Sequence, residues 1–153
     1  MILSCARRND IEQATKYFDM MESQYCLSPT VRSYNAMIYA HSNDGNVQGA
    51  LRYLEKMIIA KVTPGIETFN YTIRAHVRAN DKDGAISSFN FFRDKFKLVP
   101  NVITMNMMIE LNILNNDKGK TLSPIIINVI IIIITSGCYG ICRYDDKYLW
   151  LSA

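Results

Sequence analysis

Few residues in this 153-residue chain have the types and spacing that chemistry at a site would need. Of the four cysteines, only Cys138 and Cys142 lie close together, as C-x3-C, which is not the C-x2-C spacing of a zinc knuckle. The sequence contains no nucleophile–base pair, phosphate-binding loop or HExxH motif. It therefore predicts a protein without enzymatic activity, and it indicates neither a cofactor nor a metal.

The two histidines belong to an internal repeat. A shift of 35 residues places VRSYN (31–35) over IETFN (66–70), and a further 36 brings VITMN (102–106) into line. The same shift aligns His41 with His76, and each unit closes with a proline: Pro29, Pro64 and Pro100. Because stacked helices lie roughly 8–10 Å apart, histidines one repeat apart are too distant to share an ion, and we interpret them as structural.

Each unit has the apolar periodicity of two helices. The first presents Tyr34, Met37, Ile38 and His41 on one face, with Ser33 as the expected N-cap. The Asn43–Asn46 cluster is a turn whose residues tolerate a left-handed conformation, and a second helix follows. Its apolar stripe is Val47, Ala50, Leu51, Leu54, Met57 and Ile58. Seven methionines are interpreted as core filler: Met20, Met21, Met37, Met57, Met105, Met107 and Met108.

Two-helix units of this length cannot bury their apolar stripes alone, so they stack. The predicted fold is an all-α solenoid over residues 1–116, with a partial repeat at 1–30, repeats at 31–65 and 66–101, and a half repeat at 102–116. Residues 117–153 form a non-repeat tail that contains the isoleucine-rich run 125–134, which is too short to cross a bilayer as a helix of about 20 residues. A genuine segment, a membrane anchor and sequence joined by truncation or read-through remain alternatives for this tail.

Charge and composition exclude few classes of function. The net charge is +3, all of it in residues 1–120, and it is too small to indicate nucleic-acid binding by itself. The first residues lack the pattern of a secretory signal, so reduced thiols are expected. They also lack the pattern of an organellar presequence.

The repeat resembles the pentatricopeptide repeat family over about residues 1–115. The resemblance rests on the period, the hydroxyl–aromatic–Asn opening, the Gly-Ala pairs of GNVQGALRYLEKM and DKDGAISSFNFF, and the closing proline. Tetratricopeptide repeats carry a Trp signature, whereas the single tryptophan here, Trp150, lies in the tail. The resemblance implies a right-handed α-solenoid that binds single-stranded RNA with one base per repeat, usually in mitochondria or chloroplasts.

The resemblance also assigns base-reading positions. The asparagine of each opening, Asn35, Asn70 or Asn106, would hydrogen-bond a base, since an amide offers both a donor and an acceptor. The second reading position is the last residue of the unit: Thr30, Gly65 or Asn101. The resemblance implies a pyrimidine preference for Asn70 with Asn101, whereas Gly65 has no side chain with which to read.

Two further roles follow from the family pattern. A branched apolar residue three positions before each asparagine would clamp a base; Ile103 fits, whereas Arg32 and Glu67 depart from the pattern. A basic residue near the end of each first helix would contact phosphate, and Arg7 and Arg78 match. Asn43 and Leu114 occupy the other two positions, so we expect weak RNA binding with a shallow salt dependence.

The first hypothesis is an RNA-binding protein of mitochondria, or alternatively chloroplasts, that acts in RNA processing, stability or translation. Capping by the three asparagines and solvation of the two arginines are the structural alternatives for these residues. A helical scaffold that binds a protein partner, with or without a membrane tether in the tail, is the alternative function; no other feature predicts membrane association.

Overall fold

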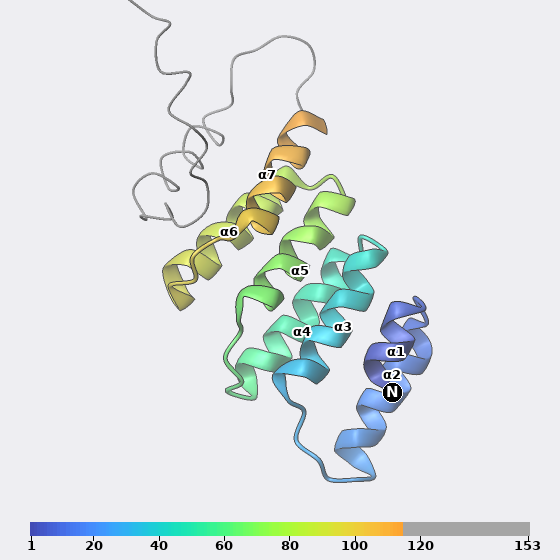
Figure 1. Cartoon of the computed structure of the whole chain (residues 1–153). Coiled ribbons are helices and arrows are strands. Elements are labelled where there is room, and N and C mark those ends of the chain that lie inside the picture. Colours follow the sequence, from blue (N-terminus) through green and yellow to red (C-terminus); the bar gives the residue numbers. More distant parts are fainter. Residues whose placement is uncertain (115–153) are drawn as a thin grey trace, which may run out of the picture. The chain divides into compact units, whose positions relative to one another are not determined.

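The computed structural model describes residues 1–114, in which six helices form three consecutive hairpins and a seventh helix follows them (Figure 1). The expectations for the tail, including the isoleucine-rich run, lie outside the described residues. The helices are α1 (Ile2–Arg7), α2 (Ile11–Ser23), α3 (Val31–Asn43), α4 (Val47–Ile59), α5 (Ile66–Arg78), α6 (Lys82–Phe96) and α7 (Val102–Leu114). The pairs α3–α4 and α5–α6 fall within the predicted units 31–65 and 66–101.

The hairpins stack one after another. The first helix of each unit packs against the first helix of the next, as α1 on α3, α3 on α5 and α5 on α7 (Figure 1). Each second helix also contacts the first helix of the following unit. Thus α1, α3, α5 and α7 form one layer and α2, α4 and α6 the other, and no strand occurs in residues 1–114. This arrangement confirms the predicted all-α solenoid.

Left-handed residues recur at both turns of the repeat. Between the two helices of a unit the backbone φ is positive at Asn9, Gly45 and Asn80, with values of 60°, 66° and 54°. After the second helix it is positive at Cys26, Lys61 and Lys97. The positive φ of Gly45 confirms the predicted left-handed turn within Asn43–Asn46. Glycine and asparagine adopt this conformation at the lowest cost.

The start of α3 differs from the expectation for Ser33. The helix begins at Val31 and its N-cap residue is the extended Thr30, so Ser33 lies inside the first turn and is not the N-cap. The equivalent hydroxyls of the next units, Thr68 and Thr104, show the reason. Each accepts a hydrogen bond from the backbone N–H of the residue that precedes its helix and so serves the cap from within the first turn. The Ser33 hydroxyl makes no cap bond and instead donates to Sδ of Met21 at 3.8 Å.

Aromatic and aliphatic side chains fill the space between the layers. Phe18 packs edge-on against Tyr34 and Tyr53, and in the next unit Phe69 stacks on Phe92. Most of the predicted stripes are buried, including Tyr34, Met37 and Ile38 of the first helix and Ala50, Leu54 and Met57 of the second. Burial of side chains of this size stabilises the fold by about 1.5–3 kcal/mol each.

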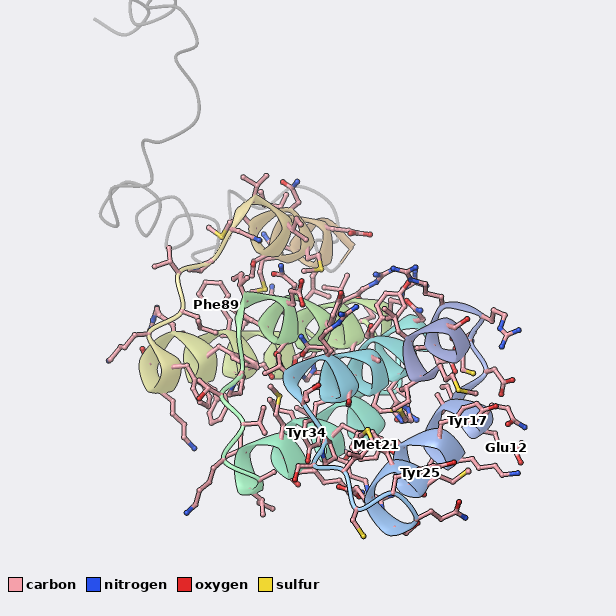
Figure 2. All side chains as sticks on the ribbon, turned by 60° about the horizontal axis from the view of Figure 1, so that its bottom comes forward. Glu12, Tyr17, Met21, Tyr25, Tyr34 and Phe89 are labelled. Atoms are coloured by element: carbon pink, nitrogen blue, oxygen red, sulfur yellow. The ribbon has the colours of Figure 1, made fainter. Side chains whose placement is uncertain are left out.

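The interpretation of the methionines as core is correct for four of the seven and wrong for three. The buried four are Met37, Met57, Met105 and Met108. Met20, Met21 and Met107 are only partly buried, because they face grooves rather than a neighbouring helix. Figure 2 shows Met21 near Tyr17 and Tyr25, with which it lines a shallow apolar pocket beside α1 and α2.

The structure also shows the state of two cysteines and the lengths of the helices. Cys5 is buried and Cys26 exposed, and both thiols are free. Within residues 1–114, every helix is too short or too polar to cross a membrane.

Candidate nucleic-acid interface

Two adjacent pockets lie along the layer of first helices. The α3–α5 pocket is lined from α1, α3 and α5 and includes Arg7, Asn35 and Tyr39. The α5–α7 pocket is lined from α5 and α7 and includes Asn70, Arg78 and Ile103. Glu67 and Tyr71 line both pockets, so the two form one continuous groove surface across α5.

The groove brings together five of the residues assigned from the sequence. Arg7 and Asn35 lie in the α3–α5 pocket, and Asn70, Arg78 and Ile103 lie in the α5–α7 pocket. Ile103 is 58% exposed, and both arginines are exposed, so all three can meet a ligand in the groove. Their roles as base clamp and phosphate contacts stay predictions.

Asn35 is held by the helix of the following unit. Its side chain is buried, and its Oδ1 accepts a hydrogen bond from the Thr68 hydroxyl at 2.7 Å. That hydroxyl in turn accepts the backbone N–H of Gly65 at 3.2 Å. Because a carboxylate only accepts, the amide is oriented with its nitrogen toward Glu67 and its oxygen toward the Thr68 hydroxyl. Nδ2 of Asn35 donates to Oε2 of Glu67 at 3.2 Å.

Asn70 repeats this arrangement one unit later. Its buried amide accepts a hydrogen bond at Oδ1 from the Thr104 hydroxyl, and its Nδ2 donates to Oδ1 of Asn101 at 3.4 Å. Asn101 also uses Oδ1 to accept the backbone N–H of Thr104 at 3.0 Å, as an N-cap does. Asn70 and Asn101, the two reading residues assigned to this repeat, are therefore in direct contact.

The remaining assigned residues lie elsewhere. Asn106 is exposed on α7 and lines neither groove pocket, and Thr30 and Gly65 are the extended N-cap residues of α3 and α5. Gly65 has no side chain with which to contact a base. The structural alternative is that the asparagines cap their own helices. The hydrogen bonds of Asn35 and Asn70 instead reach a threonine of the next unit.

The sequence reasoning missed two features of this groove. Thr68 and Thr104 orient the asparagines, and the recurring hydroxyl of the VRSYN-type openings was the signal that could have identified them. Tyr39 and Tyr71 pack edge-to-face with centroids 5.2 Å apart, and the Arg74 guanidinium lies 5.5 Å from the centroid of Tyr39. Tyr39 and Arg74 occupy the same repeat position with different side chains, and Tyr71 aligns with Ala36, so a search for residue types that recur could not reveal them.

The electrostatics of the groove centre on α5. Burial raises the pKa of Tyr71 above its usual value, and the nearby Glu67 carboxylate raises it further. Tyr71 is therefore a neutral phenol at physiological pH. Aromatic rings beside arginine side chains are the surfaces on which unpaired bases stack.

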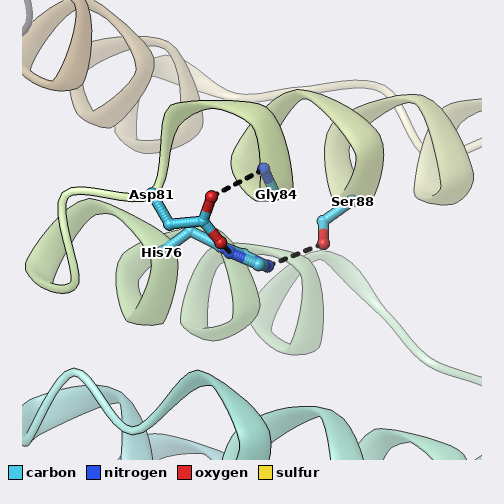
Figure 3. A network of polar contacts seen from close by, with 4 residues as sticks. All are labelled: His76, Asp81, Gly84 and Ser88. Atoms are coloured by element: carbon cyan, nitrogen blue, oxygen red, sulfur yellow. Dashed lines mark hydrogen bonds and ion pairs between the residues drawn. The ribbon is translucent and has the colours of Figure 1, made fainter.

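A second polar cluster joins α5 to α6 away from the groove. The ring of His76 contacts Oδ2 of Asp81 through Nδ1 and Oγ of Ser88 through Nε2, both at 2.9 Å (Figure 3). Asp81 also accepts the backbone N–H of Gly84 and so caps α6. This bond, together with the His76 contact, lowers the pKa of Asp81 below its usual value.

The sequence did not predict this Ser–His–Asp connectivity, which matches that of a hydrolytic triad. The His76 side chain is 4% exposed, and none of the three residues lines either groove pocket. Both ring nitrogens are engaged, so the cluster acts as a clasp between two helices. The equivalent His41 instead stacks on Tyr53, and its Nδ1 has no hydrogen-bond partner among the described residues.

Stacked two-helix units with a groove along their first helices define the chain as a helical-repeat protein. Its sequence matches the model described as "PPR repeat" over residues 1–26 and the pentatricopeptide repeat domain over residues 27–79. The chain belongs to the pentatricopeptide repeat family.

Curated relatives from Arabidopsis thaliana agree with this assignment. A pentatricopeptide repeat-containing protein described as mitochondrial is 28% identical over 57% of this chain and 14% of its own length. A putative one, also described as mitochondrial, is 36% identical over 49% of this chain and 12% of its own length, and another, 27% identical over 39% and 10%, is described as chloroplastic. The matched segment therefore covers about one seventh or less of these relatives.

Solved structures show the same fold. The maize pentatricopeptide repeat protein PPR10 superposes with a TM-score of 0.68 at 22% identity, covering 89% of this chain and 18% of PPR10. The corresponding domain of Arabidopsis thaliana protein-only RNase P 1, solved in complex with tRNA, gives 0.57 at 15% identity over 88% of this chain and 78% of that domain.

Proposed function

We propose that this chain binds single-stranded RNA in the groove along α1, α3, α5 and α7, without catalysing a reaction on it. The observation that carries the proposal is the repeated pair of Asn35 and Asn70, each held by the next unit and each lining a groove pocket. The tRNA complex of the structurally similar domain supports RNA as the ligand class. Relatives described as mitochondrial or chloroplastic support an organellar location, where the chain would act in RNA processing, stability or translation.

The groove has the chemistry that unpaired bases require. The fixed amides of Asn35 and Asn70 present N–H donors, Tyr39 and Tyr71 offer ring faces and edges, and Ile103 offers an exposed apolar surface. Both Arg7 and Arg78 can pair with phosphates. At the Asn70 repeat we propose a pyrimidine, one carbonyl oxygen of which accepts the Nδ2 hydrogen of Asn70 that Asn101 does not use.

A fluorescence anisotropy titration tests this proposal with labelled single-stranded RNA, pyrimidine-rich or purine-rich, at several salt concentrations. Replacing both Asn70 and Asn101 by Ala should abolish the preference for pyrimidine-rich RNA. The Arg78→Ala variant should weaken binding to every sequence and reduce the salt slope by about 0.7, the value for one contact with a single strand.

The matched control is Arg93→Ala, because Arg93 lies on α6, lines neither groove pocket and pairs with the adjacent Asp94. This variant makes the same change in net charge outside the groove and should bind RNA nearly as the parent does. Failure of the chain to bind any single-stranded RNA would refute the proposal, as would equal losses in the Arg78 and Arg93 variants.

A further inference from the structure

The two fixed asparagines of the groove have different partners for the same atom. Nδ2 of Asn70 donates to the side-chain oxygen of Asn101, the last residue of its unit. The corresponding last residue for Asn35 is Gly65, which has no side chain. Nδ2 of Asn35 donates instead to a carboxylate oxygen of Glu67, at 3.2 Å, from the first turn of the next helix.

On the basis of the proposed RNA binding, we propose that Glu67 replaces the missing reading side chain at Gly65 and makes the Asn35 site selective for guanine. Glu67 departs from the apolar residue that the repeat pattern places there, and it is the acidic side chain that lines both groove pockets together with Tyr71. Glu67 is exposed, whereas the Asn35 amide behind it is 5% exposed.

The hydrogen-bonding capacity of the two side chains determines the base. Oδ1 of Asn35 accepts the Thr68 hydroxyl with one of its two lone pairs, and one hydrogen of Nδ2 points to Glu67, so one donor hydrogen remains on the nitrogen that faces Glu67. An ionised carboxylate only accepts, and its two oxygens offer about four lone-pair sites, of which Asn35 uses one. Where Nδ2 meets Glu67, the site therefore presents one donor beside the two acceptor oxygens of the carboxylate.

Guanine complements this arrangement along its Watson–Crick edge. Its O6 accepts the remaining Asn35 hydrogen, while N1–H and the N2 amino group both donate to the carboxylate. Cytosine places the acceptors N3 and O2 where guanine has donors, so it would face the carboxylate with lone pairs. Uracil has one ring donor between two acceptors, and adenine lacks an acceptor at the O6 position.

The surroundings of Glu67 permit a carboxylate in an RNA-binding groove. Arg7 and Arg32 line the same α3–α5 pocket, and their positive charges reduce the repulsion between the Glu67 carboxylate and RNA phosphates. Tyr39 and Tyr71 line it as well, and an aromatic surface beside the reading edge can hold the plane of the base.

The experiment uses the whole chain and an oligouridine about ten nucleotides long, with guanosine, adenosine, cytidine or inosine at one central position. The strand can shift along the groove, so the register need not be known. Guanosine should improve the affinity at least about fivefold over the other standard nucleosides, in line with a bidentate base contact. Inosine lacks the N2 amino group and should lose part of this gain.

Two variants separate the reading role from simple charge. Glu67→Gln keeps the shape but replaces one acceptor by a donor, so the guanosine preference and the inosine penalty should both disappear. Glu110→Gln removes one negative charge from the α5–α7 pocket without touching a reading asparagine, and both effects should persist. Circular dichroism should show equal helix content, since both glutamates are exposed.

The possible failures are distinguishable. Binding of oligouridine with the same nucleoside preference in the parent and in Glu67→Gln would overturn the role of Glu67 and leave the proposed RNA binding intact. Loss of the preference in both Glu67→Gln and Glu110→Gln would also overturn it, since charge alone would then be responsible. If neither the parent nor any variant binds any of the RNAs, both proposals fail.

Discussion

The hydroxyl of Thr68 donates a 2.7 Å hydrogen bond to Oδ1 of Asn35, joining the first helices of two successive units. Because the same oxygen accepts the backbone N–H of Gly65, one hydroxyl serves a helix start and a groove side chain at once. Thr104 makes the equivalent pair of bonds to Asn70 and Asn101, so this connection is a repeated element of the solenoid.

We expect the Thr68→Val substitution to lower the free energy of unfolding by about 1–3 kcal/mol. It keeps the volume but leaves the buried Oδ1 of Asn35 without its donor and the N–H of Gly65 without its acceptor. Thr72→Val is the matched control, because the equally buried Thr72 hydroxyl donates only to the carbonyl of Thr68 within α5, and it should cost less than about 1 kcal/mol. Urea unfolding measures both; equal losses would contradict the prediction.

Two glycines provide a test of close packing between helices. A Cβ on Gly84 would lie 2.1 Å from Oδ2 of Asp81 and 2.5 Å from Nδ1 of His76, inside the clasp between α5 and α6. Gly84→Ala should therefore destabilise the fold by about 1–3 kcal/mol, despite the better helix propensity of alanine. Gly65→Ala has open space around the added Cβ and should change stability by less than about 0.5 kcal/mol. Thermal unfolding of the pair would refute the assignment if both variants lost the same stability.

Asp81 should contribute stability that acid removes. Its pKa is lowered in the fold, mainly by the N–H of Gly84 and then by His76, so its contribution is complete above the unfolded-state pKa of about 4 and is lost as the pH falls through the folded-state value. Asp81→Asn should lower stability at pH 7 by less than about 1 kcal/mol, because asparagine still caps a helix, as Asn46 does for α4. Urea unfolding at neutral and acidic pH should show the difference shrinking below about pH 4; a constant difference would contradict the assignment.

His41 should produce a second pH dependence, at a higher pH. Burial lowers its pKa in the fold, and the positive Arg52 adds to this, although Asp44 opposes both. The unfolded chain therefore binds the proton more readily, and stability should decline as the pH falls below about 6.5 toward the folded-state pKa. Replacing His41 by Gln should flatten the stability profile in this window. Parallel profiles for the two proteins would show that His41 does not titrate with folding.

The sequence predicts the fold of residues 1–114 well, because repetition and helical periodicity are both local patterns. The helices fall inside the predicted units, and the Gly45 turn has the expected left-handed backbone. Ser33 was misplaced because a hydroxyl near a helix start serves either as the N-cap or from the first turn, and composition alone does not distinguish these roles.

The candidate site was only partly predictable. The repeat alignment identified Asn35 and Asn70, but their hydrogen bonds to Thr68 and Thr104 depend on the distance between stacked helices, which no single unit encodes. The repeat alignment identified Glu67 only as a departure from an apolar pattern. In the structure, the Glu67 carboxylate accepts a hydrogen bond from the Asn35 amide. Contacts of this kind join different positions of different repeats, so a comparison of equivalent positions does not reveal them.

The packing of each first helix mainly against its nearest neighbours determines how far a local disturbance can travel. The main contacts of each described helix are with the next one or two helices along the chain. In such a linear array, opening of one unit costs the interfaces on its two sides and leaves distant units intact. An RNA that bridges several units would then tie together segments that otherwise open separately, and amide hydrogen exchange would slow over all of them at once.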